Sequence, residues 1–108
     1  MNEPTDQVPP IMLDALNGHH MLIMQSPNSG WMFKIDRDER IVDGTRVFVT
    51  VRRPDPALMY PQAIVEKNLL SDIPSKINIE IYARILDAHE KAEKQGYGLL
   101  TTLSHFED

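Results

Sequence analysis

The chain contains no cysteine, so no disulfide bond supports the fold and no thiolate is available for catalysis or metal binding. No stretch approaches the roughly 18 consecutive apolar residues that a membrane-spanning helix requires. Glycine-rich phosphate loops are absent, and no serine lies in the Gly-x-Ser-x-Gly context of a hydrolase nucleophile. These absences exclude thiol chemistry and a helical membrane span, and they leave nucleotide binding and serine hydrolysis without support.

Positive charge is also scarce. The net charge is −5, and the only tight basic cluster is Arg52-Arg53. Binding of phosphate backbones requires a basic face, so the composition argues against a nucleic-acid partner.

The 108 residues, 42% of them apolar and 25% charged, fit a single globular domain. Residues 1–10 are polar and rich in proline, which indicates a flexible arm before a domain over residues 11–108. If this arm is the trimmed tether of a secreted protein, the compartment is periplasmic or extracellular; otherwise the cysteine-free composition fits the cytoplasm. The sequence leaves the oligomeric state open, a homo-oligomer included.

The first half of the chain has the alternation and the turn residues of β-hairpins. Asn17-Gly18 lies between apolar runs at 11–16 and 20–25, which is a strong hairpin signal. The alternative for 11–16 is a single helical turn behind Pro10. A strand over 31–36 follows the turn at 27–30, and a charged loop is expected at 37–40.

The clearest strand of the chain lies at 45–52. Its valines 47, 49 and 51 share one face, and residues 46, 48, 50 and 52 share the other.

The second half is more ambiguous. Prolines 54, 56 and 61 interrupt the sheet, and residues 62–70 fit either a strand or a helix. Residues 77–86 alternate β-branched and polar side chains, which favours a strand, although a helical stripe also fits 76–95. A short helix or a charged loop is expected over 87–95, and a last edge strand over 99–103.

The sequence therefore predicts a mainly β fold, a small antiparallel β-sandwich or roll with room for a short C-terminal helix. The alternative is an α+β fold, in which a three- to four-stranded meander over 19–52 is followed by helices at 61–71 and 76–95.

Candidate catalytic or metal-binding residues are few. Adjacent side chains of a strand point to opposite faces, so His19 and His20 cannot both bind one ion, and we expect no metal site and no cofactor. The acidic residues of the predicted loop 36–43 alternate with basic ones, as in a solvated loop; they are Asp36, Asp38, Glu39 and Asp43.

The segment from Pro27 to Trp31 is the most distinctive local feature. Pro27 and Gly30 indicate a sharp turn, in which a positive φ is expected at Gly30 and exposed side chains at Asn28 and Ser29. Trp31 is expected to anchor the core at the end of the turn. A loop displayed by a rigid pair of strands is the usual way to build a binding surface.

Two short motifs in this region resemble those of known families. Ser29-Gly30-Trp31, the strand at 47–51 and Pro54 resemble the small β domain of bacterial protease-complex accessory proteins of the PrcB type, in which a Thr/Ser-Gly-Tyr step opens one hairpin strand. More distantly, Asn28 to Trp31 and Arg53-Pro54-Asp55 are similar to two loops of chagasin-type cysteine-protease inhibitors. The resemblance covers residues 27–56 and implies a β-sandwich that binds protein.

The sequence predicts a non-catalytic protein-binding module whose partner is a protein of unknown identity. The predicted interface comprises the loops at 27–30 and 52–56, with eight candidate residues: Pro27, Asn28, Ser29, Gly30, Trp31, Arg52, Arg53 and Pro54. The alternative is a small enzyme or ligand-binding protein that uses His19, His20 and the acidic loop 36–43.

Overall fold

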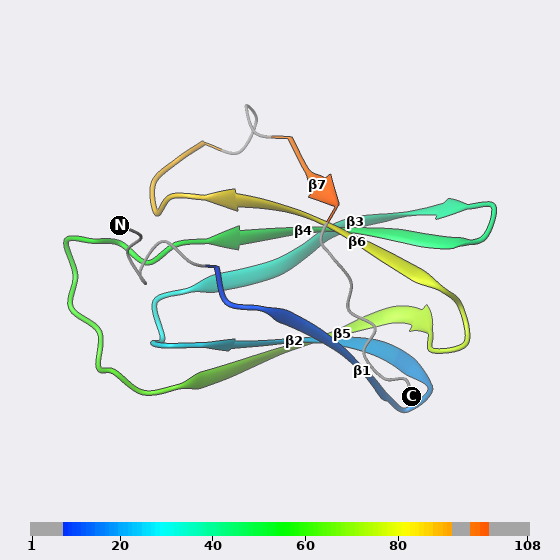
Figure 1. The fold of residues 1–108 in the computed structure, drawn as a ribbon, viewed down its shortest axis with the longest axis horizontal. Coiled ribbons are helices and arrows are strands. Elements are labelled where there is room, and N and C mark those ends of the chain that lie inside the picture. Colours follow the sequence, from blue (N-terminus) through cyan, green and yellow to red (C-terminus); the bar gives the residue numbers. More distant parts are fainter. Residues whose placement is uncertain (1–7, 92–95, 100–108) are drawn as a thin grey trace.

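The computed structural model describes residues 8–91 and 96–99, and this part of the chain is mainly β, with no helix. Two sheets pack against each other as a sandwich (Figure 1). The strands are β1 (Ile11–Leu16), β2 (His19–Ser26), β3 (Met32–Ile41), β4 (Gly44–Arg52), β5 (Val65–Pro74), β6 (Ile79–Leu86) and β7 (Gly98–Leu99). The predicted fold class is confirmed.

One sheet has the strand order β1-β2-β5 and the other β3-β4-β6-β7. All neighbours are antiparallel except β4 and β6, which run parallel in the register Thr45↔Ile79 to Arg52↔Leu86. The chain leaves the second sheet after β4, forms β5 in the first sheet and returns as β6. This crossover links the two sheets covalently at both ends of β5.

The turn between β1 and β2 confirms the predicted hairpin. Asn17 and Gly18 have φ values of 54° and 80°. Two consecutive positive φ angles are required by the type I′ turn, whose twist matches that of the strands. The alternative of a helical turn at 11–16 is therefore wrong.

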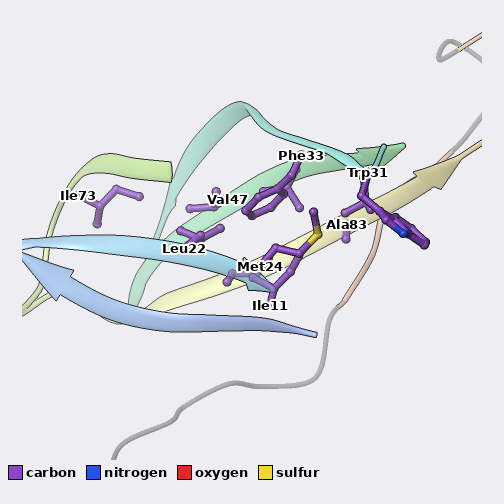
Figure 2. Close-up of a cluster of buried hydrophobic side chains, with 11 residues drawn as sticks. Ile11, Leu22, Met24, Trp31, Phe33, Val47, Ile73 and Ala83 are labelled. Atoms are coloured by element: carbon purple, nitrogen blue, oxygen red, sulfur yellow. The ribbon is translucent and has the colours of Figure 1, made fainter. Parts of the chain in front are cut away.

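The core lies between the inner faces of the sheets and includes Leu22 and Met24 of β2 and the three alternating valines of β4 (Figure 2). Val47, Val49 and Val51 are completely buried, as their alternation predicts. The inner face of β6 supplies Ile81 and Ala83. On the outer face of β4, Phe48 is also buried, because Arg37 and two tyrosine rings cover it.

Several sequence predictions are wrong at the level of elements. Residues 37–40 are not a loop, because β3 continues to Ile41 and includes these charged residues. Its pairing with β4 shifts register between Ile35 and Arg37. Residues 65–74 and 79–86 are strands, so the α+β alternative is wrong. Residues 87–91 contain no helix, whereas 92–95 and 100–103 lie outside the described residues.

Part of the predicted arm contacts the domain. Val8 packs against the core, and Pro9 is buried, whereas residues 1–7 lie outside the described part. Within the described residues, no helix has the length and apolar character needed to cross a membrane.

Candidate functional site

A groove of about 830 Å³ opens at one end of the sandwich. Three chain segments line it: the loop between β2 and β3, the segment that follows β4, and the turn that follows β6. The lining residues are Pro27, Asn28, Trp31, Arg53, Pro54, Asp55, Pro56, Leu58, Tyr60, Asp87, Ala88, His89 and Glu90.

The strand pairing explains why these segments meet. β4 and β6 are parallel and end at the paired residues Arg52 and Leu86, so the chain leaves both strands at the same end of the sheet. The loop that precedes β3 lies there too, because Met32 pairs with Arg52. The predicted loops 27–30 and 52–56 thus share one groove, although Ser29, Gly30 and Arg52 do not line it.

Gly30 allows the first two segments to approach closely. A Cβ atom at Gly30 would lie 2.7 Å from Cζ of Tyr60 and 2.8 Å from Cβ of Pro54, well inside van der Waals contact. The glycines with positive φ are Gly18 and Gly44, so the predicted positive φ at Gly30 is wrong. Glycine is needed here for space and not for backbone conformation.

Internal hydrogen bonds hold the loop between β2 and β3. Oδ1 of Asn28 accepts a bond of 2.8 Å from the Gly30 amide, and Oγ of Ser26 donates to the carbonyl oxygens of Asn28 and Val65. Ser29 is exposed, as predicted, but Asn28 is half-buried and stabilises the loop. Trp31 is 2% exposed, which confirms that it is a core residue.

Asp55 organises the second segment. One carboxylate oxygen accepts a bond of 2.9 Å from the Ala57 amide, and the other lies 3.0 Å from Nε2 of His89 in the third segment. The Ala57 amide, followed by His89, lowers the pKa of Asp55 below its ordinary value because both stabilise the ionised carboxylate. The Asp55 amide donates in turn to the hydroxyl of Tyr60.

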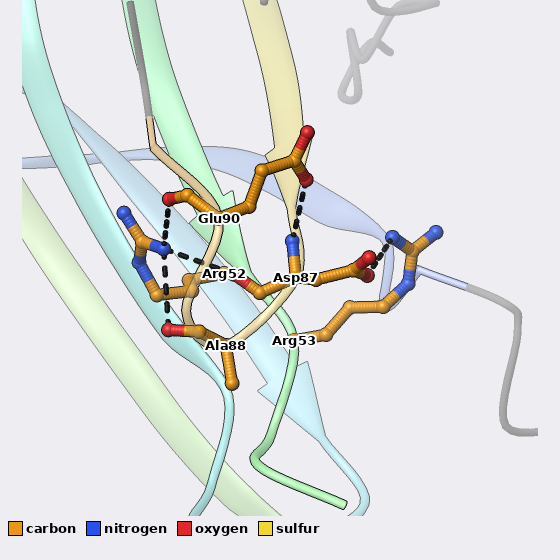
Figure 3. Close-up of polar contacts among 5 residues, drawn as sticks. All are labelled: Arg52, Arg53, Asp87, Ala88 and Glu90. Carbon is orange, nitrogen blue, oxygen red and sulfur yellow. Dashed lines mark hydrogen bonds and ion pairs between the residues drawn. The ribbon is translucent and has the colours of Figure 1, made fainter.

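Two arginines fix the third segment, the turn at 87–90 (Figure 3). Nη1 of Arg52 donates to the carbonyl oxygens of Asp87, Ala88 and Glu90 at 2.9, 3.3 and 2.9 Å. Arg53 forms an ion pair of 3.1 Å with Asp87, and Oε1 of Glu90 accepts a bond from the Asp87 amide. Arg52 therefore holds the turn at 87–90, which lines the groove, although Arg52 itself does not line it.

The sequence predictions missed the third segment, together with Leu58 and Tyr60. The arginine pair after β4 was identified, but its partners at 87–90 lie 34 or more residues further along the chain. No local pattern indicates the parallel pairing of β4 with β6 that brings them together.

Both histidines of the alternative site bond to backbone carbonyl oxygens. His19 bonds to the carbonyl oxygen of Asn17, and Nε2 of buried His20 donates to the carbonyl oxygen of Ile77 at 2.6 Å. Among residues 8–91 and 96–99, no three His, Asp or Glu side chains gather in an arrangement that could hold a metal ion.

Most of the predicted acidic loop belongs to β3, and its first carboxylate is already bonded. Asp36 accepts hydrogen bonds from Thr50 and from the hydroxyl of Tyr97. Burial, followed by the hydrogen bond to Asp36 and its negative charge, raises the pKa of the Tyr97 phenol. This contact joins the segment before β7 to the outer face of the sheet.

Comparisons of the chain with protein-family models, with curated proteins and with solved structures find no match.

Proposed function

We propose that this chain is a non-catalytic protein-binding module that receives part of its partner in the groove. The observation that supports this most is the convergence of the two loops chosen from the sequence, 27–30 and 52–56, at one groove. Three prolines and the rings of Trp31 and Tyr60 are among its lining residues, and large aromatic side chains are enriched at the energetic centres of protein interfaces.

The rigidity of the lining also supports binding. Each loop is ordered by its own side chains, Asn28 in the first and Asp55 in the second, and Arg52 and Arg53 attach the turn at 87–90. A surface that is already ordered loses less conformational entropy when a partner binds.

The resemblance of residues 27–56 to PrcB-type accessory domains suggests a protease complex as the setting of this binding. The chagasin likeness is weaker at the groove, because Asp55 stands where that family has a tryptophan after Arg-Pro. Asp55 is used to hold its own loop and His89. The proposal is therefore an accessory protein, and it does not extend to inhibition of a cysteine protease.

The test is a selection of peptides from an unbiased phage-displayed library on the immobilised protein, followed by affinity measurements with variants. Leu58 lines the groove and is 57% exposed, so Leu58→Ser should leave the fold intact and weaken the selected peptides at least tenfold. Ile64→Ser is the matched control, because Ile64 is 79% exposed and does not line the groove.

A second pair of variants tests the shape of the groove. Gly30→Ala should displace Tyr60 and Pro54 and weaken the same peptides, whereas Gly96→Ala adds a methyl group where no atom lies within 4 Å. Circular dichroism checks that each variant is folded. If folded Leu58→Ser binds every selected peptide as well as the unmodified protein does, the groove is not the binding site.

A further inference from the structure

The groove combines an apolar surface with an excess of carboxylates. Pro27, Pro54, Pro56 and Leu58 line it beside the rings of Trp31 and Tyr60. Leu58 is the most accessible of the large apolar side chains there, at 57% exposure, whereas Trp31 lies beneath the surface at 2%. A partner therefore meets aliphatic and proline surface first, which favours apolar side chains in the ligand.

The charges of the lining are predominantly negative. Among the lining residues that the structure describes, Asp55, Asp87 and Glu90 contribute three carboxylates, and Arg53 contributes one guanidinium. The Asp87 side chain is 72% exposed and lies on the same turn as Glu90. Arg52 does not line the groove and directs its guanidinium at three carbonyl oxygens of that turn. The chain as a whole, the groove included, carries a net charge of −5.

From this arrangement we infer that the groove binds a short segment of a partner protein in which basic and apolar side chains are combined. Lysine and arginine suit both features, because their aliphatic stems can lie on apolar surface while their charged ends reach the carboxylates at 87 and 90. The groove is open to solvent, so a segment within a longer chain can enter it. This inference rests on the proposed function and specifies the chemistry of the partner.

The experiment measures the affinity of the protein for three labelled dodecapeptides by fluorescence anisotropy. The second and third peptides each differ from the first in one property. The first alternates lysine with leucine, the second replaces lysine by glutamate, and the third replaces leucine by serine. The first should bind, and both replacements should weaken binding at least tenfold. Raising the salt concentration from about 50 to 300 mM should weaken the first peptide, because exposed charges are then screened.

A double variant assigns the charge effect to the groove. Asp87→Asn with Glu90→Gln removes two charges but keeps oxygen atoms that can accept the bonds from Arg53 and the Asp87 amide. It should weaken the first peptide about three- to tenfold, which is typical of two partly exposed ion pairs. Glu66→Gln with Asp72→Asn makes the same change of charge at two residues of β5 that do not line the groove, and it should have no effect.

The outcomes separate this inference from the proposed function. If peptides selected from the unbiased library depend on Leu58 but the glutamate peptide binds as well as the lysine peptide, the groove binds protein and the inference is overturned. The inference is also overturned if the Asp87 and Glu90 double variant binds the lysine peptide unchanged. If no peptide depends on Leu58, the proposed function fails as well.

Discussion

At the scale of single residues, the side chains that shape the groove act mainly on their own loops. Gly30 makes room for Tyr60, and Asn28 and Asp55 accept backbone bonds within the segments that carry them. Asp55 differs from Asn28 because it also bonds to a residue of another segment, His89. Its charge therefore links the order of the second segment to that of the third.

This role of Asp55 makes the loop sensitive to acid. A carboxylate with a lowered pKa contributes stability that is complete above its unfolded value, 3.8, and is lost as the pH falls through the folded value. In an NMR titration, the Ala57 amide proton should therefore shift with a midpoint below pH 3.8. Asp55→Asn should abolish this titration. A midpoint at or above 3.8 would show that the ionised carboxylate gains nothing from the Ala57 amide or from His89.

At the scale of elements, the turn at 87–90 depends on β4 more than on its own sequence. It contains one backbone hydrogen bond, from Glu90 to Asp87, and contains no helix. Three carbonyl oxygens of this turn accept hydrogen bonds from Arg52, the last residue of β4. The conformation of this turn is therefore fixed largely by Arg52, at the end of β4.

Arg52→Gln should release this turn while the sheets stay folded. A hydrogen bond from a charged donor contributes about 1.5 kcal/mol or more, so the Glu90 amide should exchange its hydrogen roughly tenfold faster. Hydrogen exchange followed by NMR gives this rate directly.

Arg46→Gln is the matched control on the same face of β4, because Arg46 forms an exposed ion pair with Glu80 and contacts the Tyr82 ring. It should leave the exchange of the Glu90 amide unchanged. Equal rates in Arg52→Gln and Arg46→Gln would mean that Arg52 does not hold the turn.

The strands were predictable from the sequence to the extent that their signals are local. The alternation at 45–52 and 77–86 and the Asn17-Gly18 turn identify β4, β6 and the first hairpin, because side-chain period and turn conformation depend on neighbouring residues. The extension of β3 through 37–40 was missed, since a charged edge strand has the composition of a loop. The contribution of the turn at 87–90 to the groove could not be predicted, because it depends on the pairing of β6 with β4 across the crossover.

At the scale of the whole molecule, that crossover should make the two sheets unfold together. The chain passes from β4 to β5 to β6, so neither sheet can separate without disturbing strands that are continuous with the other. The core contains residues of both sheets, among them Leu22 and Val49, together with Trp31, which directly precedes β3. Loss of either sheet would expose the inner face of the other, which is unfavourable for a chain with one small core.

Trp31 allows a direct test, because it is the only tryptophan and lies in this core. Its fluorescence and the far-UV circular dichroism of the whole chain should change with the same midpoint and slope in urea, as expected for a two-state transition. Val49→Ala, which removes fully buried atoms of β4, should shift both curves equally, by about 1–3 kcal/mol. If the fluorescence changed at lower urea than the dichroism, the end of the sandwich that carries the groove would unfold separately, and the rigidity on which its proposed binding depends would be lost.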